Sequence, residues 1–91
     1  LIKYLKKSLV PMSNLNKYNT AFVETFSLQD DKKIKELKYN EIDEWDSIGH
    51  MTLIAALEEC FKISFETDDI VDFSSYLKGK EILQKYKVSI D

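Results

Sequence analysis

Residues 47–61 read SIGHMTLIAALEECF, and this is the stretch that decides the fold. Apolar residues recur in it at spacings of three and four, which is the period of an α-helix. At about 100° per residue, one broad side of such a helix collects five apolar side chains. These are Leu53, Ile54, Leu57, Cys60 and Phe61. The pattern predicts a helix from about Ser47 to Phe61 with this side in the core.

The opposite side of the same helix carries a second, shorter apolar stripe. It consists of Ile48, Met51 and Ala55, with the carboxylates of Glu58 and Glu59 beside it. A helix that needs one core face would not repeat apolar residues there. The stripe is therefore either a docking surface for a basic partner with a small apolar pocket, or it is buried under the long segment that precedes the helix.

A first helix is expected before this one, with Asn19 or Thr20 as its N-cap. Its apolar side consists of Ala21, Phe22, Val23 and Phe26. Residues 28–45 then form a long polar connection, which its scattered apolar residues would hold against the core. These are Leu28, Ile34, Leu37, Tyr39, Ile42 and Trp45. A strand over residues 37–42 is a weaker alternative.

Two helices are expected after the central one. Thr67-Asp68-Asp69 can cap a short helix over Ile70 and Val71, and a last helix runs from about Tyr76 to Tyr86. The side chains expected to face inward on the last helix are Leu77, Ile82 and Leu83. Gly79 inside it costs about 1 kcal/mol relative to alanine, which suggests a close approach of helices. The prediction is an all-α four-helix bundle with three main helices, one short helix and a long first loop.

Length and composition place the chain among small single-domain proteins. It has 91 residues, 44% of them hydrophobic, and one cysteine, Cys60. No intramolecular disulfide can form, which fits a reducing cytoplasm, and no apolar run approaches the roughly 20 residues of a membrane span. Residues 12–91 are expected to form the domain. With Met12 as initiator, residues 1–11 would be an added extension; the alternative is a basic surface-binding segment.

The charges are unevenly distributed along the chain. Residues 41–72 contain ten acidic residues against Lys62 alone, whereas the chain as a whole has a net charge of −3. Such a concentration of negative charge repels nucleic acid and attracts basic protein surfaces. A nucleic-acid partner is therefore not expected.

Ser47 is the residue whose position suggests a function. It lies at a helix start beside Asp46, and His50 is the one histidine of the chain. Without an orienting partner for His50 or an oxyanion site, a serine hydrolase is not supported, and no catalytic residue is assigned. From spacing alone, helix capping by Asp46 or Ser47 remains an equal alternative to a functional serine. Asp68-Asp69 lacks the spacing of a calcium loop, so no metal site is assigned.

The segment Trp45-Asp46-Ser47-Ile48-Gly49-His50-Met51, followed by the Leu53–Glu59 apolar and Glu-Glu pattern, resembles the prosthetic-group helix of acyl carrier proteins. Within that superfamily it is most similar to small free-standing carriers with a Trp-Asp-Ser segment. The similarity covers roughly residues 21–86. Cys60, Lys62 and Thr52 depart from the pattern of fatty-acid carriers, which favours a specialised pathway over bulk fatty-acid synthesis.

The resemblance implies roles for particular residues. Ser47 would receive a 4′-phosphopantetheine arm from coenzyme A, with Asp46 at the interface with a Mg²⁺-dependent phosphopantetheinyl transferase. Partner docking would use Ile48, Met51, Glu58 and Glu59. The aromatic residues able to line a space for the cargo would be Phe61, Phe65 and Phe73. The other partners would be an acyl- or aminoacyl-loading ligase and a downstream acyltransferase or synthase.

The function expected from the sequence is thus a monomeric, non-enzymatic carrier of a thioester-linked acyl or aminoacyl group. The alternative is a carrier-like helical interaction module that never takes a prosthetic group and uses its acidic helix to bind a partner. Both make the same prediction for the fold, and they differ in whether Ser47 is modified.

Overall fold

The structure is a computed structural model that describes residues 13–90; the expectations for residues 1–11 and Met12 lie outside this range. Its elements are α2 (Asn14–Thr25), the 3₁₀ turn η1 (Ile34–Glu36), α3 (Ser47–Phe61), α4 (Thr67–Asp72) and α5 (Tyr76–Lys85). The prediction of an all-α chain with three longer helices and one short helix is confirmed. Within residues 13–90 the β-type pairing is one isolated bridge between Lys38 and Ser75, so the alternative strand is absent there.

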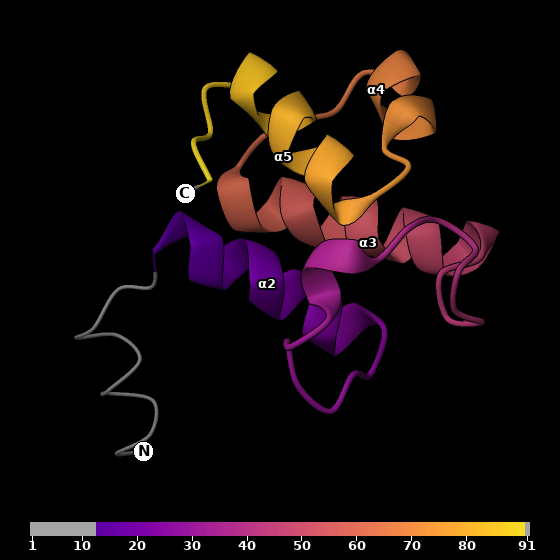
Figure 1. The fold of residues 1–91 in the computed structure, drawn as a ribbon. Helices are drawn as coiled ribbons and strands as arrows, with labels where there is room; N and C mark the ends of the chain where they lie inside the picture. The colour runs from indigo at the N-terminus through magenta and orange to yellow at the C-terminus, as the bar shows by residue number, and fades with distance from the viewer. Residues whose placement is uncertain (1–12, 91) are drawn as a thin grey trace.

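The helices form two pairs (Figure 1). α2 packs along α3, and α4 and α5 lie next to each other above that pair. The described chain ends near the beginning of α2, where the Asn14 side-chain amide donates a hydrogen bond to the Ser89 carbonyl at 3.1 Å.

α2 begins at Asn14, and the prediction of a cap at Asn19 or Thr20 was wrong. The N-cap is Ser13, whose hydroxyl accepts a hydrogen bond from the Asn16 N–H at 3.1 Å. Asn19 lies inside the helix, and its side chain accepts a hydrogen bond from the Tyr76 hydroxyl. The first turn contains one apolar residue, Leu15, so hydrophobic spacing does not mark it; the Ser13 cap and packing of the fully buried Tyr18 in the next turn both support it.

Aromatic side chains fill the centre of the bundle. The Phe22 ring of α2 contacts the rings of Trp45 and Tyr76, with centroids 5.5 and 5.3 Å apart, and Trp45 stacks on Phe26 at 5.2 Å. The largest fully buried side chains are Trp45, Tyr18, Tyr76, Phe22, Phe26, Phe73, Leu53, Ile54, Leu57 and Leu83. Trp45 and the buried Ile34 therefore hold the long first connection to the core, as expected, whereas Tyr39 remains exposed.

α3 has the predicted bounds and the predicted orientation. Leu53, Ile54 and Leu57 are buried. Cys60 and Phe61 are half-buried, because the helix ends beside them at Lys62, which adopts the left-handed conformation of a C-cap. Burial raises the pKa of the Cys60 thiol.

The side of α5 that faces the core differs in part from the predicted one. Ile82 and Leu83 are buried as predicted, but Leu77 is 57% exposed, and the buried residues of the first turns are Tyr76 and Gly79. A β-carbon on Gly79 would collide with the Phe73 ring and the Tyr18 hydroxyl. A close approach at this glycine is therefore present, but it is made by aromatic side chains, one from α2 and one from the residue that follows α4.

α4 is held to α5 by a buried carboxylate. Asp69 is 4% exposed and accepts hydrogen bonds from the Lys85 ammonium and the Tyr86 hydroxyl. The prediction that Asp69 belongs to the segment that caps this helix was therefore wrong. The N-cap of α4 is Glu66, whose N–H donates to the Tyr86 hydroxyl at 2.9 Å. The hydrogen bonds from Lys85 and then Tyr86 lower the pKa of Asp69 below its usual range, against the opposing effect of burial.

Candidate functional site

The beginning of α3 is fixed by Asp46. Its backbone is extended, and its carboxylate accepts a hydrogen bond from the Gly49 N–H at 2.8 Å, which makes it the N-cap. Negative charge at this position also interacts favourably with the helix dipole. Of the two candidate caps, Asp46 is the N-cap, and the hydroxyl of Ser47 does not serve as one.

Gly49 is required where the entering loop crosses the first turn of α3. A β-carbon there would collide with the backbone carbonyl of Glu44. Trp45, the next residue, is fully buried and ties the loop to the core. The chain therefore enters α3 along one path, and this path leaves Ser47 exposed as the first residue of the helix.

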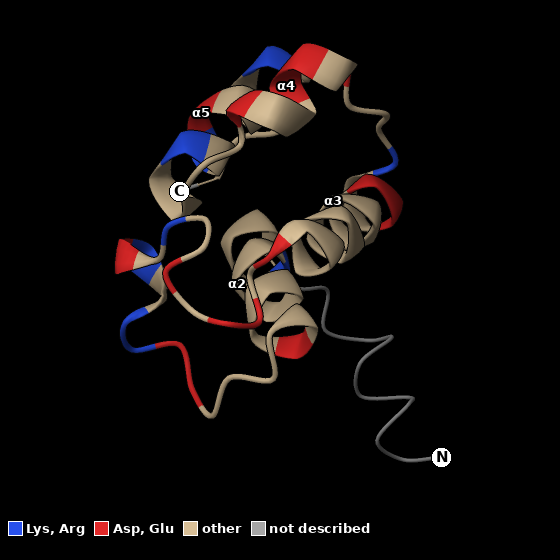
Figure 2. Cartoon of the chain, turned by 90° about the vertical axis from the view of Figure 1, so that its right-hand side faces the viewer, with Lys and Arg blue, Asp and Glu red and all other residues tan. Residues whose placement is uncertain are grey.

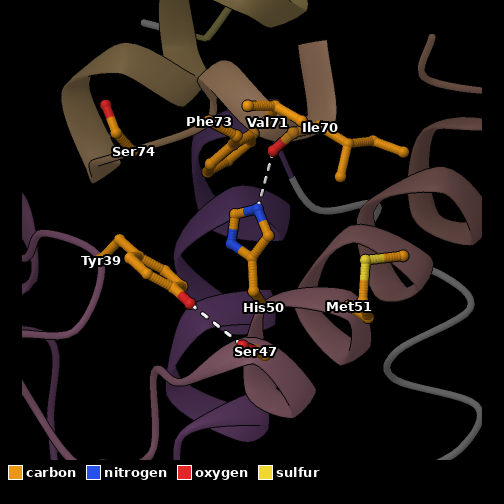
Figure 3. A pocket seen from close by; sticks show the side chains of 8 residues that line it. All are labelled: Tyr39, Ser47, His50, Met51, Ile70, Val71, Phe73 and Ser74. Atoms are coloured by element: carbon orange, nitrogen blue, oxygen red, sulfur yellow. Dashed lines mark hydrogen bonds between the residues drawn. The ribbon is translucent and has the colours of Figure 1, made fainter. Parts of the chain in front are cut away.

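The hydroxyl of Ser47 has one hydrogen-bond partner within residues 13–90. It lies 3.3 Å from the hydroxyl of Tyr39, and either oxygen can be the donor. Tyr39 belongs to the long first connection, and Figure 3 shows its ring directed toward the start of α3.

His50 is not a base for Ser47. The Trp45 indole N–H donates to His50 Nδ1 at 2.9 Å, which requires that Nδ1 carry no proton. The proton is therefore on Nε2, which lies 2.8 Å from the Ile70 carbonyl oxygen and donates to it. Both ring nitrogens are engaged, so His50 is a half-buried structural residue that connects α3 to α4.

A groove of about 410 Å³ opens beside Ser47, between α3, α4 and the first connection (Figure 3). Its walls are Tyr39, Ser47, His50, Met51, Ile70, Val71, Phe73 and Ser74. None of these side chains carries a charge when His50 has the single proton assigned above. The groove is therefore suited to an uncharged, mainly apolar group.

The three aromatic residues assigned to cargo lining are not brought together at this groove. Phe73 forms part of its wall, whereas Phe61 and Phe65 are not among the lining residues. Phe61 is half-buried, and Phe65 is buried, with its ring edge-on to those of Phe73 and Tyr86.

The second apolar stripe of α3 is on the surface, which excludes the alternative that Met51 and Ala55 are buried under the loop. Ile48 is 77% and Met51 51% exposed, and Val71 of α4, which the sequence did not single out, is 74% exposed. Met51 and Val71 both border the groove, so the apolar surface extends from α3 to α4.

The two carboxylates assigned to docking differ in their surroundings. Glu59 is exposed, whereas Glu58 is half-buried and accepts a hydrogen bond from the Phe65 N–H at 2.8 Å. Figure 2 shows acidic residues at both ends of α3 and along α4, while lysines lie mainly on α5 and around η1. The helix that carries the exposed apolar stripe therefore has acidic residues at both of its ends.

Two residues of the site were missed by sequence reasoning. Tyr39 was expected only to hold the loop, and Val71 was assigned only to the short helix. No spacing in the sequence relates Tyr39 to Ser47, because the contact depends on how the loop folds back; Val71 follows Ile70 in a helix too short for a periodic pattern.

Comparison of the chain with protein-family models, with curated proteins and with solved structures gave no match. In the described part of the chain, no helix has the length and hydrophobicity needed to cross a bilayer. Residues 13–90 also contain no group of three or more His, Cys, Asp or Glu side chains arranged to hold a metal ion.

Proposed function

We propose that the chain is a carrier protein whose Ser47 bears a 4′-phosphopantetheine arm and that it shuttles a thioester-linked acyl or aminoacyl group between partner enzymes. The observation that carries the proposal is the exposed Ser47 at the head of α3, with both nitrogens of His50 engaged elsewhere. A serine displayed without its own activating base suits modification by another enzyme.

The surroundings of Ser47 fit such a group. Ser47 is exposed and lines the groove, whose uncharged walls can accept the apolar parts of a flexible arm. When bound, the arm supplies a thiol that holds the cargo as a thioester. Its phosphate would be joined at Ser47, where the Tyr39 hydroxyl can donate a hydrogen bond.

The acidic and apolar surface around Ser47 supports docking to basic partner enzymes. Ile48 and Met51 provide the exposed apolar contacts, Val71 extends them, and Asp46 and Glu59 provide exposed charge. Charged rims raise association rates more than affinity, which suits a carrier that must leave each partner quickly. The proposed partners are the transferase, a loading ligase and a downstream acyltransferase or synthase of a specialised pathway.

Intact-mass measurement tests the proposal. The chain is incubated with coenzyme A, Mg²⁺ and a broad-specificity phosphopantetheinyl transferase, with a known carrier treated in parallel. We expect one phosphopantetheinyl group on the wild type and on Ser64→Ala, and none on Ser47→Ala. Ser64 is a matched control because it is an exposed serine just beyond the other end of α3, about 22 Å along the 15-residue helix.

An unchanged mass of the wild-type chain beside a modified control carrier would overturn the proposal. The acidic and apolar surface would then favour the helical interaction module that lacks a prosthetic group. Modification that persists in Ser47→Ala would also contradict it, because the arm would be attached elsewhere.

A further inference from the structure

Two titratable side chains near Ser47 are already engaged in hydrogen bonds with other groups. The carboxylate of Asp46 is used in capping the N–H of Gly49. The two nitrogens of His50 are used by Trp45 and by the carbonyl of Ile70. These two titratable side chains are therefore committed to holding the helix start and α4 in place.

Two backbone hydrogen bonds, one at Tyr39 and one at the next residue, fix the position of Tyr39. Its N–H donates to the Ser74 carbonyl at 2.8 Å, and the next residue, Asn40, donates to the Trp45 carbonyl at 2.9 Å. Asn40 has a φ of 69°, the left-handed conformation that reverses the chain here. Tyr39 is thus anchored both to the segment before α5 and to the segment that enters α3.

The ring of Tyr39 is also packed in a defined orientation. It lies edge-on to the rings of His50 and Trp45, with centroid distances of 5.3 and 6.4 Å. Its hydroxyl is left at the rim of the groove, 3.3 Å from the oxygen of Ser47 (Figure 3). Backbone anchors and ring packing together place one polar group beside the proposed attachment oxygen.

We propose that Tyr39 is a positioning residue for the modification of Ser47, an inference that rests on the function proposed above. In the unmodified protein the Tyr39 O–H donates a hydrogen bond to Ser47 Oγ, which orients that oxygen and leaves the serine proton accessible to the transferase. After modification Ser47 has no hydroxyl proton, and the Tyr39 O–H donates to the phosphodiester. The phenol is therefore a hydrogen-bond donor both before and after modification.

Modification of Ser47 is a phosphoryl transfer from coenzyme A. The bond between Ser47 Oγ and the β-phosphorus of coenzyme A forms while the bond from that phosphorus to the bridging pyrophosphate oxygen breaks. Adenosine 3′,5′-bisphosphate leaves with the electron pair of the broken bond. The proton of Ser47 passes to a base of the Mg²⁺-dependent transferase. Tyr39 orients the oxygen and does not change its own protonation.

Tyr39→Phe tests the role of the hydroxyl, because it keeps the ring that packs on His50 and Trp45. The kinetics of modification by the transferase are measured for wild type and variant with coenzyme A and Mg²⁺. We expect kcat to fall by about three- to tenfold, the range for loss of one neutral hydrogen bond, with KM for the carrier unchanged. The ³¹P resonance of the modified protein should shift between wild type and variant.

The possible outcomes separate this inference from the proposed function. A modified wild type with the same kcat and the same ³¹P resonance in Tyr39→Phe overturns the role of Tyr39 and leaves the carrier proposal standing. A change confined to KM also overturns it, because Tyr39 would then be a contact of the transferase. An unmodified wild type removes the proposed function, and this inference with it. Trp45 fluorescence and the melting temperature, unchanged in the variant, confirm that its fold is intact.

Discussion

The indole N–H of Trp45 donates to Nδ1 of His50 at 2.9 Å, while Nε2 of the same ring lies 2.8 Å from the carbonyl of Ile70. One imidazole therefore connects a fully buried residue that precedes α3 to the backbone of α4. Because the donor to Nδ1 has no acceptor capacity, this geometry requires the neutral ring with its proton on Nε2.

The first prediction concerns this connection. His50→Gln can accept from Trp45 through its amide oxygen and donate to Ile70 through its amide nitrogen, whereas His50→Leu can do neither. Leaving the buried indole N–H unpaired should cost His50→Leu about 1–3 kcal/mol of unfolding free energy, and His50→Gln should lose less. Urea denaturation measures both. Equal losses in the two variants would mean that ring packing, rather than hydrogen bonding, determines the role of His50.

A second prediction follows from the lowered pKa of Asp69. In the unfolded chain its carboxyl titrates near the ordinary value of about 3.9, whereas hydrogen bonds from Lys85 and Tyr86 lower the pKa in the folded protein. Between the two values the unfolded chain binds more protons, so the unfolding free energy falls as the pH decreases. The contribution of Asp69 should be complete above about pH 5 and disappear as the pH falls through the folded-state value.

Asp69→Asn provides the comparison, because the amide has a similar shape but does not titrate. We expect the wild type to be more stable at neutral pH and the difference between the two proteins to narrow as the solution is acidified. Thermal melts from pH 7 to pH 3 measure this. Wild-type and variant curves that stay parallel throughout that range would show that Asp69 does not contribute to the acid sensitivity.

The third prediction separates the two neighbouring glutamates. Glu59→Lys should slow modification by the transferase at low salt by at most about fivefold, as expected for one exposed ion pair, and leave the melting temperature unchanged. Glu58→Lys should also lower the melting temperature, because it removes the acceptor of the Phe65 N–H. Modification kinetics at two salt concentrations, combined with melts, distinguish them. An unaltered rate for Glu59→Lys would remove that residue from the docking surface.

The fourth prediction concerns Gly79. Alanine favours a helix by about 1 kcal/mol over glycine, but here its methyl group would meet the buried side chains of Tyr18 and Phe73. We therefore expect Gly79→Ala to destabilise the protein by about 1–3 kcal/mol through overpacking. The exposed Gln84→Ala on the same helix should stay within about 0.5 kcal/mol of wild type. A gain in stability for Gly79→Ala would show that the aromatic rings move aside.

The fifth prediction contrasts two sides of α3. Leu57 is fully buried, so Leu57→Ala should cost about 2–5 kcal/mol. Met51, on the exposed side of the same helix, should tolerate alanine within about 0.5 kcal/mol. Chemical denaturation of both variants measures the difference. Similar losses would mean that the helix is rotated relative to the structure.

Local pattern predicted some elements better than others. α3 was predicted at both ends because it is the most apolar segment of the described chain and Asp46 and Lys62 end it locally. The beginning of α2 was missed because Asn14 to Lys17 contains one apolar residue, so the helix start is marked only by the Ser13 cap and by the buried Tyr18 that follows. Leu77 was assigned to the core by its hydrophobicity, but Tyr76 next to it occupies that position and turns Leu77 to solvent.

The sequence by itself determined the all-α class, the bounds of α3 and the two unlike sides of that helix, because these follow from spacing along one segment. Only the tertiary structure decided that Tyr39 lies beside Ser47, that His50 is committed to Trp45 and Ile70, and that Asp69 is buried against α5. Each of these contacts joins residues from separate elements. Their distances depend on how the connections fold over the core, which no local period in the chain encodes.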